Sequence, residues 1–123
     1  MLEGDQGDIW IGTSHGLNRY NVPSGRITHY FHDPKNHNSL THSAVVNFMK
    51  DDDGTIWVGT HLGLNNLDPA TDRISRVFYE PSPPHRPPYS ANTILHIYRD
   101  PTRTLWVATF SGLKTVNLQR RRF

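Results

Sequence analysis

The strongest constraint on this chain is an internal repeat that occurs three times. The copies read "DIWIGTSHGLNRYNV" at residues 8–22, "TIWVGTHLGLNNLDP" at residues 55–69 and "TLWVATFSGLKTVNL" at residues 104–118. The three tryptophans of the protein take the same place in each copy, and they are spaced 47 and then 49 residues apart. A period in this range is typical of proteins that repeat one supersecondary unit, so it guides the assignment of every other segment.

The second copy is the complete one, and it predicts four short strands. Its segments "SAVVNFMK", "TIWVGTH", "GLNNLD" and "RISRVFYE" are rich in Val, Ile, Phe and Tyr, and they are separated by Asp-Gly, His-Leu-Gly and Pro-Ala-Thr-Asp. Separators of this kind are turn sequences, and runs of this length are typical of strands. No stretch shows helical periodicity over the roughly ten residues that a helix needs.

The first and third copies supply fewer strands. We expect strands at 8–13, 17–21 and 26–32 in the first copy, and at 93–99, 104–109 and 113–117 in the third. Met1 aligns with Phe48, so the first copy should lack most of its first strand. Residues 119–123 fall where the third copy should turn toward a fourth strand, which is therefore expected to be missing.

Four antiparallel strands repeated every 40 to 50 residues are the pattern of a β-propeller blade. The predicted fold class is all-β: a β-propeller fragment of four-stranded antiparallel blades, with one complete blade flanked by two partial ones. We expect a partial blade at 1–32, a linker at 33–42, the complete blade at 43–80, a Pro-rich linker at 81–91 and a partial blade at 92–123. Closed propellers need about 4 to 8 blades, so we expect a piece of a longer sensor or a truncated reading frame.

The two linkers differ in length, and this difference accounts for the change of period. Proline donates no sheet hydrogen bond, so the prolines at 81, 83, 84, 87 and 88 predict a stiff, extended connection rather than a strand. A disordered interdomain linker is the alternative for this segment.

The repeated tryptophan is predicted to pack between neighbouring blades. Side chains alternate along a strand, so Trp57 and Gly59 share one face while Ile56 and Val58 share the other. Both faces are apolar, as expected for a sheet that lies between two other sheets, and Gly59 leaves room for the next blade. Ala108 takes this place in the third copy. The predicted structural residues of the repeat are Trp10, Gly12, Gly16, Trp57, Gly59, Gly63, Trp106 and Gly112.

Composition narrows the class of protein further. The 123 residues allow one ordinary domain, and a formal charge of +2 is too small to indicate a nucleic-acid surface. The Arg run at 120–122 is interpreted as a solvated end. The absence of cysteine excludes disulfides and thiolate metal sites. No apolar run approaches the roughly 20 residues of a membrane span, and no signal-peptide pattern follows Met1.

Motifs for metal binding and catalysis are weak. The histidines at 32, 37 and 42 are spaced by five, which does not place them on one strand face, so we interpret them as surface residues. "DDDG" at 51–54 lacks the glutamate of a calcium loop, because Thr60 stands at that position. There is no Gly-x-Ser-x-Gly elbow and no phosphate loop, so we expect no metal, no cofactor and no catalytic residue.

The second copy and the residues before it resemble the two-component regulator propeller repeat family. The matching elements are "DDDGTIWVGTHLGLNNLDPATDRI" and "HDPKNHNSLTHSAVVNFM", in which an Asp-Gly turn leads into Trp-x-Gly-Thr-x-x-Gly-Leu. The third copy departs from the pattern, because Arg103 stands where Gly7 and Gly54 stand. The resemblance implies the periplasmic sensor region of a bacterial hybrid histidine kinase or diguanylate cyclase, and oligosaccharide ligands in several family members.

Three classes of function remain open on the residues alone: a ligand-sensing propeller, a protein-interaction scaffold, and a propeller-fold lyase or hydrolase. The resemblance favours the first, a non-catalytic signal-input segment in the periplasm. The partners it implies are the remaining blades of a longer chain and an oligosaccharide or other small ligand. We expect no nucleic-acid partner and no membrane contact, and we expect self-association when the chain is isolated.

The candidate ligand-binding residues lie in the turn between the second and third strands of each copy. These turns carry Ser14 and His15, His61 and Leu62, and Phe110 and Ser111, each between a shared threonine and a shared glycine. We call the end of the sheets that bears these turns and the linkers the Thr–Gly rim, and the opposite end, with the turn at 51–54, the Asp–Gly rim. The frame is repeated while the inserted pair differs, and loops on a rigid scaffold often carry binding groups. We expect a ligand at the Thr–Gly rim, with Phe110 stacking on a sugar and the imidazoles forming hydrogen bonds.

Overall fold

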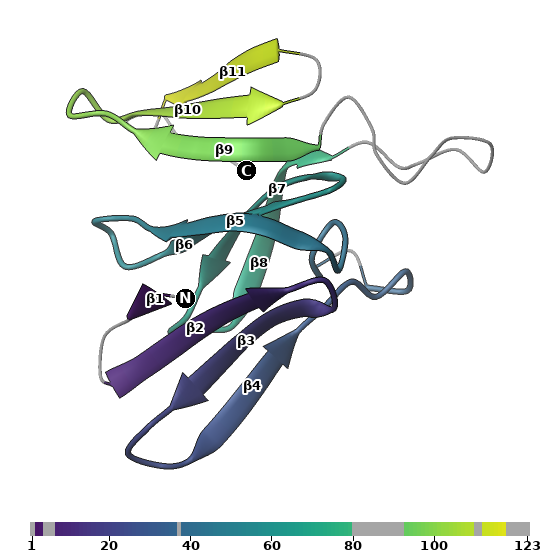
Figure 1. The fold of residues 1–123 in the computed structure, drawn as a ribbon, viewed down its shortest axis with the longest axis vertical. Helices are drawn as coiled ribbons and strands as arrows, with labels where there is room; N and C mark the ends of the chain where they lie inside the picture. Colours follow the sequence, from purple (N-terminus) through teal and green to yellow (C-terminus); the bar gives the residue numbers. More distant parts are fainter. Residues whose placement is uncertain (1, 4–6, 37, 80–92, 110–111, 118–123) are drawn as a thin grey trace.

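The computed structural model consists of three antiparallel sheets that follow one another along the chain (Figure 1). It describes residues 2–3, 7–36, 38–79, 93–109 and 112–117. Sheet I contains β1 (Leu2–Glu3), β2 (Asp8–Thr13), β3 (Gly16–Asn21) and β4 (Arg26–Tyr30). Sheet II contains β5 (Val45–Lys50), β6 (Ile56–Thr60), β7 (Gly63–Asp68) and β8 (Arg73–Tyr79), and sheet III contains β9 (Ile94–Arg99), β10 (Thr104–Thr109) and β11 (Gly112–Asn117).

The all-β class and the strand pattern predicted from the repeat are confirmed. Each strand pairs with its neighbour in sequence, so every sheet is a meander. The expected strands at 8–13, 63–68 and 104–109 have the predicted bounds, and the others differ from prediction by one or two residues at their ends. The two-residue strand β1 pairs with β2, with Leu2 opposite Trp10 and Glu3 opposite Ile9. The Pro-rich linker at 81–91 and residues 118–123 lie outside the described residues.

Each sheet has two faces, which we name by the repeated tryptophan. The front face bears the tryptophan and, two residues later, Gly12, Gly59 or Ala108; the back face bears the residues between them. The front face of sheet I packs on the back face of sheet II. This core contains Trp10, Leu17, Tyr30, Leu40, Ile56, Val58, Leu67 and Ile74, with Val45 and Phe48 against it.

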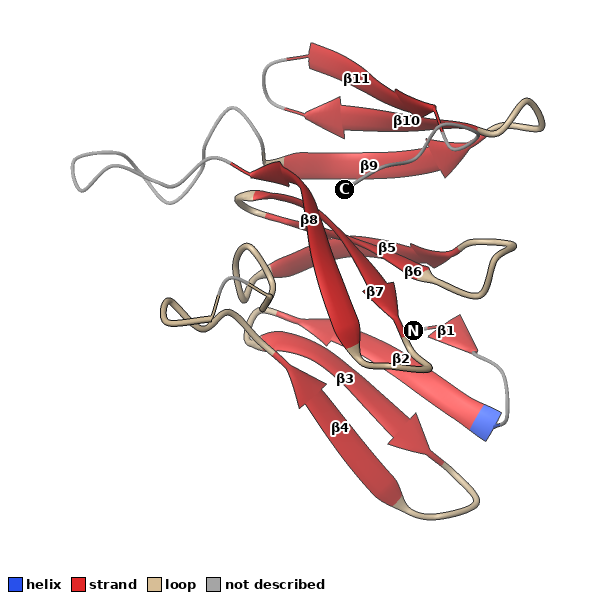
Figure 2. Cartoon of the chain, turned by 180° about the vertical axis from the view of Figure 1, so that it is seen from behind, coloured by secondary structure: helices blue, strands red, loops and turns tan. Residues whose placement is uncertain are grey.

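A second core repeats the same contact one sheet further along. Trp57 and Leu64, with Met49, lie on the front face of sheet II and pack on the back face of sheet III. The back face supplies Ile94, Ile97, Leu105, Val107 and Val116. The indoles of Trp10 and Trp57 are 1% and 0% exposed, so the tryptophans of the first two sheets lie between sheets. Figure 2 shows the three sheets one above another from behind.

The glycine beside each buried tryptophan sets how closely two sheets approach. A Cβ built on Gly59 would lie 2.5 Å from Ile94 Cγ2 on β9, and one built on Gly12 would lie 2.8 Å from Phe48 Cε1 on β5. Carbon atoms do not approach this closely, so any side chain at these two places would push the sheets apart. The repeat therefore requires glycine where the neighbouring sheet is packed.

Arg103 keeps the turn between β9 and β10 in the form that glycine gives the other copies. Arg103 has a φ of 64°, while Gly54 at the equivalent place has a φ of 86°. The Arg103 N–H donates to Asp100 O at 3.2 Å, as the Gly54 N–H donates to Asp51 O at 3.1 Å. The substitution of Arg103 for glycine thus leaves the turn intact, but a residue with a side chain adopts the left-handed backbone conformation there.

Candidate functional site

The turns of the Thr–Gly rim are held by the threonine of the repeat. Thr13 Oγ1 accepts the His15 N–H at 3.0 Å and donates to Gly16 O at 3.0 Å. Thr60 Oγ1 likewise accepts the Leu62 N–H at 3.1 Å and lies 3.2 Å from Gly63 O, to which it donates. The threonine thus closes the turn from inside, and the two residues between threonine and glycine are held on a rigid frame.

In sheet I the two inserted residues face solvent. Ser14 and His15 are exposed, and Ser14 Oγ lies 3.1 Å from His15 Nδ1. The carbonyl oxygen of His15 lies 2.8 Å from His29 Nε2 on the end of β4, and the His29 ring lies against Phe31 at 5.3 Å between centroids. The His29 and Phe31 rings therefore lie close to the backbone of the turn that carries His15.

In sheet II the two inserted residues point in different directions. Leu62 is 8% exposed, so its side chain offers little surface to a ligand. His61 is partly exposed and lies against His42 from the linker, with 5.5 Å between ring centroids. The His61 carbonyl accepts a hydrogen bond from Thr93 Oγ1 at 2.6 Å, which ties this turn to the start of sheet III.

The His42 and His61 rings favour the neutral state. Burial lowers the pKa of His42, and the neighbouring His61 and His32 rings lower it further. Burial also lowers the pKa of His61. The Ala44 N–H donates to His42 Nδ1 at 2.9 Å, which places the proton of the neutral ring on Nε2. At neutral pH the pair thus offers hydrogen-bonding groups rather than charge.

The structure describes only some of the remaining candidate residues of this rim. Phe110 and Ser111 lie outside the described residues, as does His37. His32 Nδ1 lies 2.7 Å from Leu40 O, to which the neutral ring donates a hydrogen bond. Within the described part of the chain, no group of three or more His, Asp or Glu side chains could hold a metal ion.

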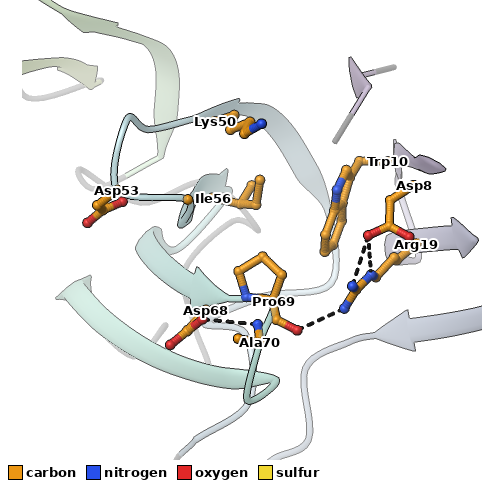
Figure 3. A pocket seen from close by; sticks show the side chains of 10 residues that line it. Asp8, Trp10, Arg19, Lys50, Asp53, Ile56, Asp68, Pro69 and Ala70 are labelled. Atoms are coloured by element: carbon orange, nitrogen blue, oxygen red, sulfur yellow. Dashed lines mark hydrogen bonds and ion pairs between the residues drawn. The ribbon is translucent and has the colours of Figure 1, made fainter. Parts of the chain in front are cut away.

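The Asp–Gly rim carries a hollow between sheets I and II, shown in Figure 3. It has a volume of about 230 Å³, with Trp10 and Ile56 among its apolar walls. Its polar lining comes from side chains of both signs: Asp8, Arg19, Lys50, Asp53 and Asp68. A second hollow of about 360 Å³ lies beside it on sheet I and shares Asp8 and Arg19. Neither hollow is lined by a residue of the Thr–Gly turns.

Arg19 joins the two sheets at the edge of these hollows. Its guanidinium pairs with Asp8 at 2.8 Å, donates to Pro69 O at 2.9 Å and lies 3.6 Å from Asp72. Burial alone would raise the pKa of Asp8, but hydrogen bonds from Asn21 and Arg19 outweigh it and lower the pKa. Burial and the hydrogen bond that Tyr30 donates to Asp72 raise the pKa of Tyr30 to about 12. Arg19 thus pairs with Asp8 and Asp72, and Tyr30 with Asp72. This is the pattern of a structural ion-pair network.

Sequence reasoning missed two features of the site. One is the contact of His42 with His61, which lie 19 residues apart and on different elements. The other is an aspartate six residues before the tryptophan: Trp57 Nε1 donates to Asp51 Oδ2 at 3.0 Å, and Trp106 Nε1 donates to Asp100 Oδ2 at 2.8 Å. The aspartate could have been noticed in the sequence, because two of the three copies carry it at the same distance from the tryptophan.

The fold and its repeats define the class of the chain: it is a segment of an all-β propeller domain. Residues 39–61, from the linker through the turn of sheet II, match the family model described as two component regulator propeller. The resemblance read from the second copy is therefore confirmed for that repeat. None of the curated proteins compared with the chain matches it.

Two solved structures have the same fold over the chain. One is an extracellular domain assigned to hybrid two component system BT3049 of B. thetaiotaomicron, with a TM-score of 0.78, 23% identity and 100% of this chain covered. The other is the extracellular domain assigned to hybrid two component system BT4673 of the same organism, with a TM-score of 0.73, 22% identity and 98% of this chain covered. This chain spans only 17% and 15% of their lengths, so it corresponds to a small part of a larger propeller. At this level of identity, the similarity shows the fold that this chain shares with part of those extracellular domains.

No helix among the described residues has the length and apolar character to cross a membrane.

Proposed function

We propose that this chain is a non-catalytic, ligand-sensing segment of the extracellular propeller of a bacterial two-component-type sensor. The observation that carries the proposal is the two component regulator propeller repeat at residues 39–61, set in a segment with the fold of such extracellular domains. The periplasm is the corresponding location, and the other blades of the propeller are its first partners. Neither an enzyme nor a pure scaffold is favoured by a specific contact in the described residues.

The proposed contact with ligand is the Thr–Gly rim. Three features support it: the threonine frame is rigid, Ser14 and His15 are exposed on it, and the His42–His61 pair is neutral at pH 7. Neutral imidazoles donate and accept hydrogen bonds, as hydroxyl-rich ligands such as oligosaccharides require. Leu62 supports the turn from inside. Phe110 and Ser111 remain candidates of the same rim.

The test compares the two rims in the same protein. The purified chain is titrated with a panel of neutral and acidic oligosaccharides by calorimetry, using the wild type, a His15→Ala/His61→Ala variant and an Asp53→Ala/Asp68→Ala variant. We expect at least one oligosaccharide to bind, and the histidine variant to weaken its binding about tenfold or more, since each lost polar contact costs about 1 kcal/mol. Loss of binding only in the aspartate variant would move the site to the hollow of Figure 3. Absence of binding across the panel would contradict the glycan class of ligand.

A further inference from the structure

The second hollow of the Asp–Gly rim is a polar space with walls from two neighbouring sheets. Its volume is about 360 Å³, and every residue that lines it is polar or charged. All of them belong to sheet I except Asp72, which lies in the turn between β7 and β8 of sheet II. Sites for small molecules have volumes of about 300–1,000 Å³, so this hollow has room for one small hydrophilic ligand.

The base of the hollow is an ion pair whose hydrogen-bonding groups are already used. Asp8 is 4% exposed, and it accepts hydrogen bonds from Arg19 Nε at 2.9 Å and from Asn21 Nδ2 at 2.8 Å. Arg19 also donates to Pro69 O of sheet II, as Figure 3 shows. These contacts join the two sheets, so a ligand would have to be bound by the other residues of the hollow.

Strand β4 and the turn before it supply hydrogen-bond donors, which we call the donor wall: Ser24, Arg26 and Thr28. Arg26 and Thr28 lie on the same face of β4 as Tyr30, which packs in the core between sheets I and II. Within the described residues, the side chains of Arg26 and Thr28 have no hydrogen bond or ion pair. Ser24 Oγ accepts the Arg26 N–H at 3.2 Å, so its own hydrogen remains available. The donor wall thus offers one cation and two hydroxyls.

Asp72 presents an acceptor from the other sheet. Its Oδ1 accepts the hydroxyl hydrogen of Tyr30 and lies 3.6 Å from Arg19 Nη1. The side chain is nevertheless 56% exposed. Tyr30 and Arg19 therefore hold the Asp72 carboxylate in place, while more than half of it remains accessible to a ligand.

We propose that this second hollow binds a sugar acid, with the ligand carboxylate on the donor wall and a ligand hydroxyl donating to Asp72. A guanidinium such as that of Arg26 binds a planar carboxylate through two parallel hydrogen bonds. A neutral sugar would leave the cation without an opposite charge, and a small anion without hydroxyls would have nothing to donate to Asp72. The site lies at the rim opposite the Thr–Gly turns, and it does not depend on a ligand there.

The binding test is an NMR titration of the ¹⁵N-labelled chain with sodium glucuronate. Glucose, which lacks the carboxylate, and acetate, which lacks the hydroxyls, are the control ligands. We expect glucuronate to shift the backbone amide signals of residues 24–28 and of Asp72. It should bind about tenfold or more tightly than either control, because only glucuronate can contact the donor wall and Asp72 together.

Variants of the donor wall separate a specific contact from general attraction of an anion. Arg26→Gln removes the cation and should weaken glucuronate binding about tenfold or more, since hydrogen bonds to charged groups are the stronger ones. Arg73→Gln removes the same charge from an exposed position on β8 that does not line the hollow, and it should leave the affinity unchanged. Thr28→Val removes only a hydroxyl and should weaken binding about threefold. The dispersion of amide signals checks that each variant is folded.

The His15→Ala/His61→Ala variant separates this site from the Thr–Gly rim, and it should bind glucuronate as the wild type does. Four results would overturn the proposal: no glucuronate-dependent shifts at residues 24–28, equal affinity for glucose, unchanged affinity in Arg26→Gln, or an equal loss in Arg73→Gln. A loss confined to the histidine variant would place glucuronate at the Thr–Gly rim instead. The role proposed for that rim is tested by its own oligosaccharide titration, so the two proposals can fail separately.

Discussion

At the residue scale, Arg103 departs from the glycine of the repeat pattern without changing the structure of the turn. Its φ of 64° lies in the left-handed region, which costs a side chain about 1 kcal/mol, while the hydrogen bonds of the turn are those of the glycine-bearing copy. The turn forms because Asp100 holds it from several sides, accepting from the Thr102 and Thr104 N–H groups and from the Trp106 indole. Its hydrogen bonds, first of all that from the Thr102 hydroxyl, lower the pKa of Asp100 to about 2.

Arg103→Gly should therefore stabilise the chain. Relief of the strained backbone is partly offset by the greater freedom of glycine in the unfolded chain, so we expect a gain of about 0.5–1 kcal/mol in the free energy of unfolding. The matched reverse change, Gly54→Arg, should destabilise by about 1–2 kcal/mol at the equivalent turn. Urea denaturation measures both. A loss of stability in Arg103→Gly would show that the Arg103 side chain contributes more than its backbone costs.

His42 makes a second prediction at this scale, on the dependence of stability on pH. The pKa values of His42 and His61 are lowered from 6.5 in the fold, so the unfolded chain binds more protons once the pH falls below about 6.5. The free energy of unfolding must then fall as the pH falls through this window, and it is unaffected by this pair above it. Protonation also removes the acceptor that His42 Nδ1 offers to the Ala44 N–H.

The variant that tests this is His42→Asn, because its amide oxygen can accept the same N–H without titrating. It should match the wild type at pH 8 and lose less stability on acidification to about pH 5. His42→Ala, which lacks the acceptor, should lose about 1 kcal/mol relative to the wild type at pH 8 and less at about pH 5, where protonation of His42 destabilises the wild type as well. Equal slopes for the wild type and His42→Asn, from urea denaturation at each pH, would exclude His42 as a source of the dependence.

At the element scale, the contact between sheets depends on two residues of the same strand, one with a large side chain and one, a glycine, with none. In β6 the Trp57 ring fills the space against sheet III, and Gly59 lets Ile94 approach within contact distance. Arg99 on β9 adds polar contacts across the same junction, to Asp52 at 2.7 Å and to Asp51 at 3.4 Å. The residues of β6 are thus constrained by the sheets that pack on its two faces, and not only by pairing within sheet II.

Trp57→Ala should cost about 3–5 kcal/mol, because it leaves a cavity between two sheets and removes the hydrogen bond that the indole donates to Oδ2 of buried Asp51. The matched variant Trp106→Ala should cost clearly less, since that ring is more than one third exposed in sheet III. Thermal unfolding of the two variants under identical conditions gives the comparison. Equal losses would mean that the two tryptophans have equivalent surroundings in solution.

At the scale of the whole molecule, the three tryptophans report on which sheet faces are covered. Trp10 and Trp57 are inaccessible between sheets, so iodide should quench only the fluorescence of Trp106 in dilute solution. Trp106→Phe should remove the accessible component, while Trp10→Phe should leave it. Quenching of all three tryptophans would contradict the packing of sheets I and II.

The amino-acid sequence alone determined the repeat, the all-β class, nearly all strand positions and the face on which each tryptophan lies. These follow from local properties: a fixed period, the alternation of side chains along a strand, and turn residues such as Gly16 and Gly63 with positive φ. Only the tertiary structure decided which side chains meet across sheets, as in the His42–His61 pair, Arg19 with Pro69 and Ile94 over Gly59. Those contacts depend on how far one sheet is rotated and displaced from the next. That rotation is set by the packing of entire faces, which no short stretch of sequence contains.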